Sequence, residues 1–85
     1  MPLDSTLVTL TRHSSDEGTP WGLDLDRHTM QLLDCDTGSI AARSMQARAC
    51  IGKMLSKVNG IPVQRCKDAA QVMEGCTRAQ LCFLP

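Results

Sequence analysis

Aromatic side chains are scarce in this chain of 85 residues: Trp21 and Phe83 are the only two, and there is no tyrosine. Proteins that bind single-stranded nucleic acids stack bases on several aromatic rings, so no nucleic-acid partner is expected. No apolar run approaches the roughly 20 residues of a membrane-spanning helix, so no membrane insertion is expected. The length predicts a single domain over residues 1–85, with its core at about 6–84.

Charge is balanced overall, with nine basic and nine acidic side chains, but the two halves differ. Residues 1–38 carry seven acids against Arg12 and Arg27, and residues 39–85 carry seven bases against Asp68 and Glu74. Because the halves of a small fold interleave, this asymmetry does not by itself predict a charged binding surface.

The five cysteines are odd in number and never form a C-x-x-C pair, and both histidines lie in the first third of the chain. This pattern favours free, mostly buried thiols over a disulfide framework or a zinc site. We therefore expect no metal and no cofactor, and a reducing, cytoplasmic location. The cysteines are Cys35, Cys50, Cys66, Cys76 and Cys82.

Alternating apolar residues and turn signals predict the order β-β-β-α-β-β-α-β. The expected strands and helices are strands at 7–12, 21–27 and 29–36, a short helix at 37–44, a hairpin at 53–63, a helix at 66–75 and a strand at 77–84. Ser39 is the expected N-cap of the first helix. Asn59-Gly60 supplies the two positive-φ positions of a tight hairpin turn, and Pro62 places the second arm of that hairpin at a sheet edge.

This order predicts an α+β, mainly β fold: a partly open, six-stranded barrel or sandwich with two helices. At this point the sequence resembles a PDZ domain over nearly its whole length. The resemblance is carried by four segments in order: Pro20-Trp21-Gly22-Leu23, Gly38-Ser39-Ile40-Ala41-Ala42-Arg43, Gly52 to Gly60, and the helix from Cys66 to Glu74.

The resemblance implies a protein-interaction module that binds the C-terminal tail of a partner by strand addition, and no enzymatic activity. It places the tail's carboxylate on the loop Pro20, Trp21, Gly22 and Leu23, where Gly22 lets the backbones approach closely. The implied peptide groove consists of Asp24, Leu25, Cys66, Ala69, Ala70 and Met73. The family often has a base shortly before this loop, and the nearest base here is Arg12.

Cys66 falls at the first position of the second helix, where the family uses histidine to select Ser or Thr at the third ligand residue from the end. A thiol is a weak hydrogen-bond donor, so an apolar residue is expected there, with an apolar residue at the terminus. A slip of one residue would place Arg65 or Lys67 at this position and favour an acidic ligand residue.

Two alternatives remain open. "DTGS" at 36–39 matches the catalytic loop of aspartic proteases, which share a proton between two carboxylates, but too few residues separate it from "CIGKML" for the strands of such a fold. The second alternative is a homodimer through an edge strand, or recognition of an internal motif. A monomer or weak dimer is expected.

Overall fold

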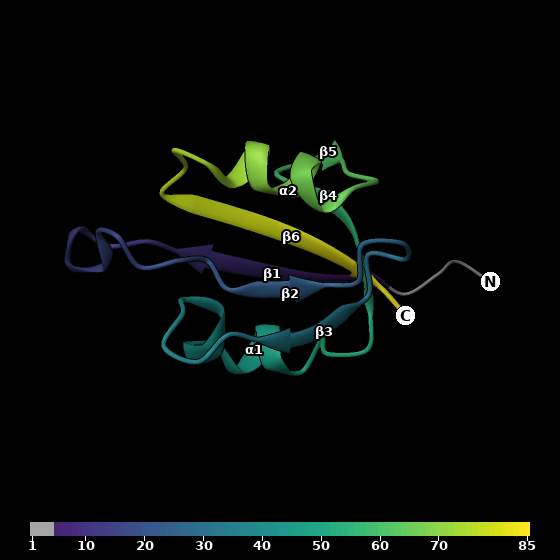
Figure 1. Ribbon diagram of the computed structural model, residues 1–85, viewed down its shortest axis with the longest axis horizontal. Helices are drawn as coiled ribbons and strands as arrows, with labels where there is room; N and C mark the ends of the chain where they lie inside the picture. The colour runs from purple at the N-terminus through teal and green to yellow at the C-terminus, as the bar shows by residue number, and fades with distance from the viewer. Residues whose placement is uncertain (1–4) are drawn as a thin grey trace.

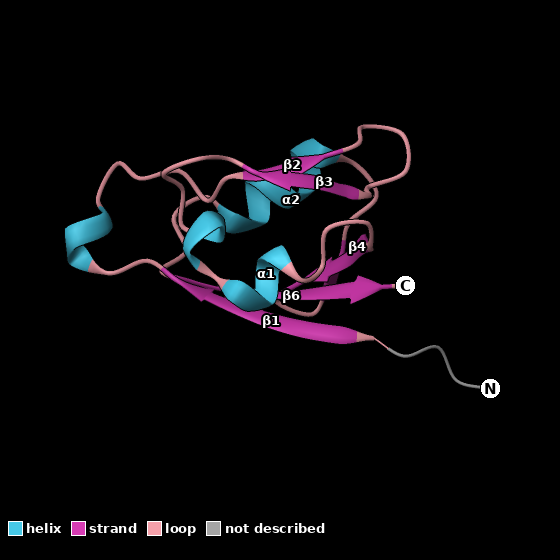
Figure 2. Ribbon diagram, turned by 90° about the horizontal axis from the view of Figure 1, so that it is seen from below, coloured by secondary structure: helices cyan, strands magenta, loops and turns pink. Residues whose placement is uncertain are grey.

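Six strands form two separate sheets in the computed structural model of the chain, which describes residues 5–85. The larger sheet has the order β1-β6-β4-β5, and β2 pairs with β3 in the smaller one. In Figure 2, β2, β3 and α2 lie on one side and β1 and β6 on the other. The strands are β1 (Thr6–Thr11), β2 (Leu23–Leu25), β3 (Leu32–Cys35), β4 (Met54–Val58), β5 (Ile61–Pro62) and β6 (Arg78–Leu84).

The helical elements are two α-helices and two single turns of 3₁₀-helix. They are η1 (Ser14–Asp16), η2 (Ala41–Arg43), α1 (Met45–Arg48) and α2 (Cys66–Met73). The start of β1 and the end of β6 lie at the same end of the molecule, and the loop between β1 and β2 projects at the opposite end (Figure 1). The sheets do not close into a barrel, so the α+β prediction of an open fold with six strands is confirmed.

The core lies between the two sheets and is built from alternate residues of the strands. Along β6, Ala79, Leu81 and Phe83 are buried, and β1 contributes Val8 and Leu10. Because side chains alternate between the two faces of a strand, the other residues of β6 point away from the core. Burial along β1 and β6 therefore has the period of two that is typical of a strand with one face on the core.

The turn between β4 and β5 has the predicted conformation. Asn59 and Gly60 have φ of 53° and 79°, as a type I′ turn requires. The Asn59 side chain also accepts a hydrogen bond from the Gln80 N–H at 2.8 Å, which ties the turn to β6. Pro62 lies in β5 at the edge of the sheet, where a missing N–H costs no ladder bond.

The first helix does not lie where the sequence predicts it. Residues 37–44 contain only the three-residue turn η2, and α1 begins after it at Met45. Ser44, not Ser39, is the N-cap of α1, because its side chain accepts a hydrogen bond from the Ala47 N–H. No helix within residues 5–85 has the length and apolar character needed to cross a membrane.

The second and third strands are shorter than predicted. β2 covers 23–25 rather than 21–27, and β3 covers 32–35 rather than 29–36. Asp26 ends β2 because its carboxylate accepts hydrogen bonds from the N–H groups of His28 and Thr29, which closes a turn. These bonds lower the pKa of Asp26. The predicted alternation within β2 is confirmed, since Leu23 and Leu25 are half-buried and Asp24 is exposed.

The five cysteines are free, but only Cys35 and Cys50 are buried. Burial raises the pKa of both thiols, because an apolar environment disfavours the thiolate. Cys66, Cys76 and Cys82 are half-buried, so the expectation of mostly buried thiols is wrong for three of the five.

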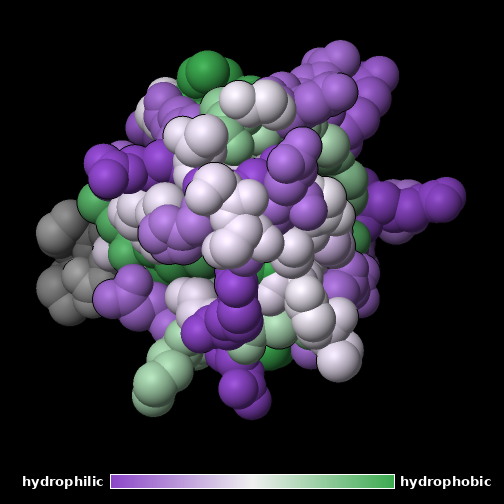
Figure 3. All heavy atoms as spheres, turned by 90° about the vertical axis from the view of Figure 1, so that its left-hand side faces the viewer, coloured by the Kyte–Doolittle hydropathy of each residue, from purple (hydrophilic) through white to green (hydrophobic). Residues whose placement is uncertain are grey.

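An ion pair holds the β1–β2 loop through η1, in the middle of the loop. The Arg43 guanidinium donates to the Asp16 carboxylate at 2.9 Å, and Asp16 is only 5% exposed. The same carboxylate accepts the His13 N–H at 3.1 Å. Hydrophilic and intermediate residues cover most of the end from which this loop projects (Figure 3). The loop is therefore fixed by polar contacts rather than by a core of its own.

Because of these contacts, the free energy of unfolding depends on whether Asp16 is protonated, and it therefore changes with pH in the acid range. The hydrogen bond from Arg43, and then that from His13, lower the pKa of Asp16 from 3.8 to about 2. Because the folded pKa is the lower one, the stabilisation is complete above pH 3.8 and is lost as the pH falls toward 2. Asp16→Asn is expected to lose less stability than the parent chain over this interval. Urea unfolding at a series of pH values measures this, and equal losses would contradict it.

Candidate functional site

A groove separates β2 from α2. Its volume is about 360 Å³, and its walls are mainly apolar side chains and the backbone at the start of β2. Other hollows on the surface have similar volumes, so size alone does not distinguish this one. Its position does, because β2 pairs only with β3 and the edge of β2 beside the groove is unpaired within residues 5–85. The groove is lined by Trp21, Gly22, Leu23, Asp24, Leu25, Cys66, Ala69, Ala70 and Met73.

The C=O groups of residues 20–22 are hydrogen-bonded within the described part of the chain, whereas the N–H groups of Trp21 and Gly22 are not. The carbonyls of Pro20, Trp21 and Gly22 accept hydrogen bonds from the N–H groups of residues 40, 41 and 36, at 3.1, 2.9 and 2.8 Å. The N–H groups of Trp21 and Gly22 donate to no acceptor within residues 5–85. Carbonyls therefore point into the protein, and two free donors remain beside the groove. Free N–H groups on successive residues of a turn can hold an anion.

Gly22 is required for a reason that the sequence did not show. Its φ is +81°, and a Cβ at this position would collide with Cβ and Oγ of Ser39. Ser39 is fully buried, and its hydroxyl accepts the Ala42 N–H at 3.1 Å. The missing side chain thus lets the loop pack against the turn at 36–41. This contact differs from the close approach of a ligand that the sequence suggested.

Trp21 connects the loop to the far end of α2. Its indole Nε1–H donates to the Met73 carbonyl at 3.2 Å, and this carbonyl lies in the last turn of α2, where intrahelical donors run out. Arg12 lies over the indole ring, with its guanidinium carbon 4.7 Å from the ring centroid, and donates to the Thr19 carbonyl at 2.7 Å. Together the two side chains fix the separation between the loop and the helix.

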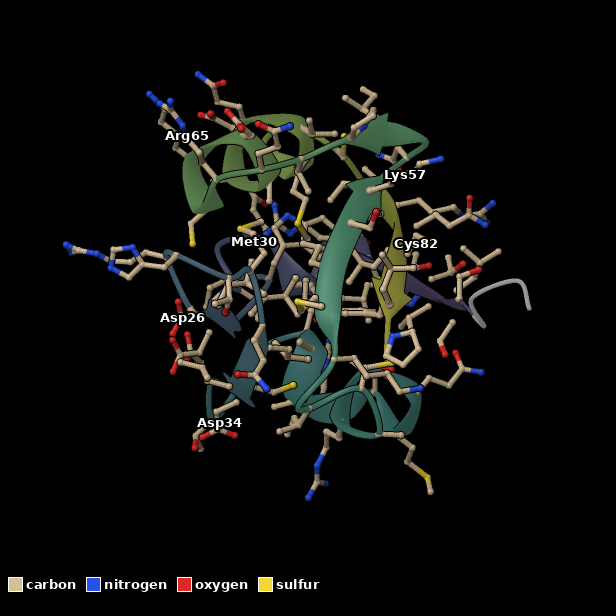
Figure 4. The ribbon with its side chains drawn as sticks, turned by 90° about the vertical axis from the view of Figure 1, so that its right-hand side faces the viewer. Asp26, Met30, Asp34, Lys57, Arg65 and Cys82 are labelled. Atoms are coloured by element: carbon tan, nitrogen blue, oxygen red, sulfur yellow. The ribbon has the colours of Figure 1, made fainter. Side chains whose placement is uncertain are left out.

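The other end of the groove is closed only weakly. The Cys66 thiol, at the first position of α2, contacts the Leu25 carbonyl at 3.7 Å and the Met30 sulfur at 4.0 Å. A thiol is a weak donor, so an incoming N–H can replace it on the Leu25 carbonyl. Figure 4 shows Met30 in the centre of the molecule and Arg65 above it at the start of α2.

The structure brings nine of the ten predicted site residues together. The exception is Pro20, which is exposed and contributes its carbonyl to the anchor of the loop rather than a surface to the groove. The sequence singled out Arg12 as the base nearest to the loop and Ser39 as an N-cap. It did not predict that Arg12 contacts Trp21 or that Ser39 packs against Gly22.

The "DTGS" segment has a structural role at this site. The Asp36 N–H donates to the Gly22 carbonyl, and Ser39 fills the space beside Gly22. The segment is the turn after β3 that anchors the loop at 20–22. Among the described residues, no group of three or more His, Cys, Asp and Glu side chains has an arrangement that could hold a metal ion.

Comparison with solved structures identifies the fold. The chain superposes on the PDZ domain from choanoflagellate SHANK1, which was solved bound to a GIRK3 peptide, with a TM-score of 0.64. The match covers 100% of this chain and 96% of that chain, at 15% sequence identity. No protein-family model matches the sequence, and no curated protein does. The chain has the PDZ fold, as the order of its motifs predicted.

Substitution of Gly22 tests the packing behind the loop. Gly22→Ala is expected to destabilise the fold by more than about 1 kcal/mol, because it adds both backbone strain and a collision with Ser39. Gly18→Ala is the matched control, because Gly18 has φ +82° and nothing lies within 4 Å of its Cβ position. Urea unfolding measures both variants, and equal losses would show that the Ser39 contact is unimportant. If the collision with Ser39 causes the extra loss, adding Ser39→Gly to the Gly22→Ala variant should restore part of the stability.

Proposed function

We propose that this chain is a protein-interaction module that holds the C-terminal tail of a partner in the groove between β2 and α2. The observation that carries the proposal is the pair of free N–H groups at Trp21 and Gly22, located where the groove meets the loop. A terminal carboxylate supplies the negative charge and the acceptors that such donors lack. The peptide-bound PDZ domain with the same fold supports a peptide as the ligand.

The rest of the tail would be bound as an added strand. The unpaired edge of β2 offers N–H and C=O groups to an extended peptide, and main-chain bonds of this kind give affinity without selecting a sequence. The terminal side chain would enter the apolar part of the groove, against Leu23, Ala70 and Met73. Burying one aliphatic side chain contributes about 1.5–3 kcal/mol.

Ordering of the peptide offsets much of this gain, so we expect micromolar affinity, or about −8 kcal/mol. Binding of this strength is reversible and suits the assembly of complexes rather than catalysis. The five free cysteines are compatible with a reducing, cytoplasmic location for such complexes.

The carboxylate is tested with two versions of one peptide that ends in an apolar residue. Charge-assisted hydrogen bonds contribute about 1.5–3 kcal/mol each, so amidation of the end should weaken binding about tenfold or more. Fluorescence anisotropy with a labelled peptide measures the two affinities. Equal affinity for the free and the amidated peptide would exclude the loop as a carboxylate site.

Cys66 is proposed to set the preference at the third residue from the ligand's end. An imidazole can donate a hydrogen bond to a hydroxyl, and a thiol does so only weakly. Cys66→His should therefore improve binding of a peptide with Thr at that position over one with Val, by about tenfold for one net hydrogen bond. Cys66→Ala is the control, and it should keep the preference for Val. If Cys66→His leaves the ratio of the two affinities unchanged, Cys66 is not the residue of α2 that faces this ligand position.

A further inference from the structure

The outer face of the β2–β3 pair presents two aspartates that lie directly opposite one another. Asp24 of β2 pairs with Asp34 of β3, and both side chains are exposed. Figure 4 shows Asp34 and Asp26 projecting outward on the same side of the molecule. Like charges at directly opposite positions of a sheet repel each other. Asp24 is also part of the groove, so this repulsion acts at its rim.

No basic side chain of the described residues forms an ion pair with either of these aspartates. The one ion pair within residues 5–85 joins Arg43 to Asp16. Arg48 lines a separate hollow together with Asp34 but makes no ion pair with it, and Asp34 otherwise accepts only the Cys35 N–H. The carboxylate of Asp24 therefore has no ion-pair partner among residues 5–85.

Three other charged side chains near the groove are Asp26, Arg65 and Lys67, and none of them offers a free carboxylate to a ligand. The Asp26 carboxylate is already used by the N–H groups of His28 and Thr29. Arg65 and Lys67 are exposed at the start of α2, and neither of them lines the groove. Asp24 is therefore the only charged side chain among the residues that line the groove.

Strand geometry determines which ligand residue meets Asp24. A tail whose end is held at Trp21 and Gly22 runs antiparallel to β2, so its last residue lies beside Leu23 and its penultimate residue opposite Asp24. Because side chains alternate, the penultimate side chain projects on the same outer face as Asp24. Opposite Cβ atoms lie about 4.5–5.5 Å apart. Asp34 is one strand further, at about 4.8 Å more, which the long side chain of Lys or Arg can span.

We propose that the groove selects tails with Lys or Arg as the penultimate residue, through Asp24 and, one strand further, Asp34. This inference rests on the proposed binding of a C-terminal tail and specifies the chemistry of that tail. The added cation relieves the repulsion between the two carboxylates while it forms its own attraction to Asp24. Both gains act only when a ligand occupies the edge of β2.

Three peptides that differ only in a penultimate Lys, Gln or Glu test the inference on the whole chain. Exposed ion pairs are weak, so Lys should bind about 2- to 5-fold more tightly than Gln, and Glu about 2- to 5-fold more weakly. Salt screens exposed charges, so the differences should shrink in about 0.5 M NaCl. Equal affinities of the three peptides at low salt would overturn the inference.

Substitutions at Asp24 separate a local charge effect from a general one. Asp24→Asn should reduce the preference for Lys, and Asp24→Lys should reverse it in favour of Glu. Glu17→Gln is the matched control: it removes one exposed acid from the projecting β1–β2 loop and should leave the preference unchanged. A preference for Lys that survives Asp24→Lys, or that Glu17→Gln removes equally, would overturn the role of Asp24.

An amidated copy of the Lys peptide distinguishes this inference from the proposed function. If amidation weakens binding while Lys, Gln and Glu bind equally, the tail site stands and only the charge selection fails. If amidation has no effect, or if none of the free peptides binds, the tail site fails and the selection at Asp24 fails with it.

Discussion

The groove depends on how the backbone of residues 20–22 divides its hydrogen bonds. A buried carbonyl needs a donor, and the turn at 36–41 supplies one for each of the three carbonyls. Once the carbonyls face this turn, the N–H groups of Trp21 and Gly22 must face the other way. Gly22 makes the arrangement possible, because the turn approaches so closely that Ser39 occupies the place of a Cβ. The loop can therefore present donors to a ligand only while the turn holds its carbonyls.

The width of the groove also depends on residues of this loop and on Arg12. Trp21 belongs to the loop but donates its indole N–H to the last turn of α2, and Arg12 stacks on the same ring while it holds the Thr19 carbonyl. A residue of the loop thus serves as a spacer between the loop and the helix. At the opposite end, the contact between Cys66 and Leu25 is long and involves a weak donor. One end of the groove is rigid and the other can open, which suits a ligand whose end is fixed and whose upstream residues vary.

The features that the sequence predicted are local. Asn59-Gly60 adopts the two positive φ values because its turn type needs only adjacent residues, and β6 alternates because its burial has a period of two. The nine groove residues were placed by the order of motifs along the chain. The predictions that failed did so either because two nearby positions carried the same local signal or because the deciding contact joined distant parts of the chain. Ser39 and Ser44 each accept an N–H three residues ahead, so the sequence could not tell which serine begins the helix.

The reason for Gly22 was hidden in the same way, because Ser39 lies seventeen positions further along the chain. Such contacts explain how this chain can share the fold of the SHANK1 PDZ domain over its full length at 15% sequence identity. The hydrogen bonds that anchor the loop use backbone C=O groups, which every residue supplies. Only a position with no room for a side chain, such as Gly22, restricts which residue can occupy it. Exposed positions such as Asp24 are free of this demand, so their charge can change without cost to the loop. In a fold held in this way, ligand preference can diverge at the rim of the groove while the anchor behind it stays the same.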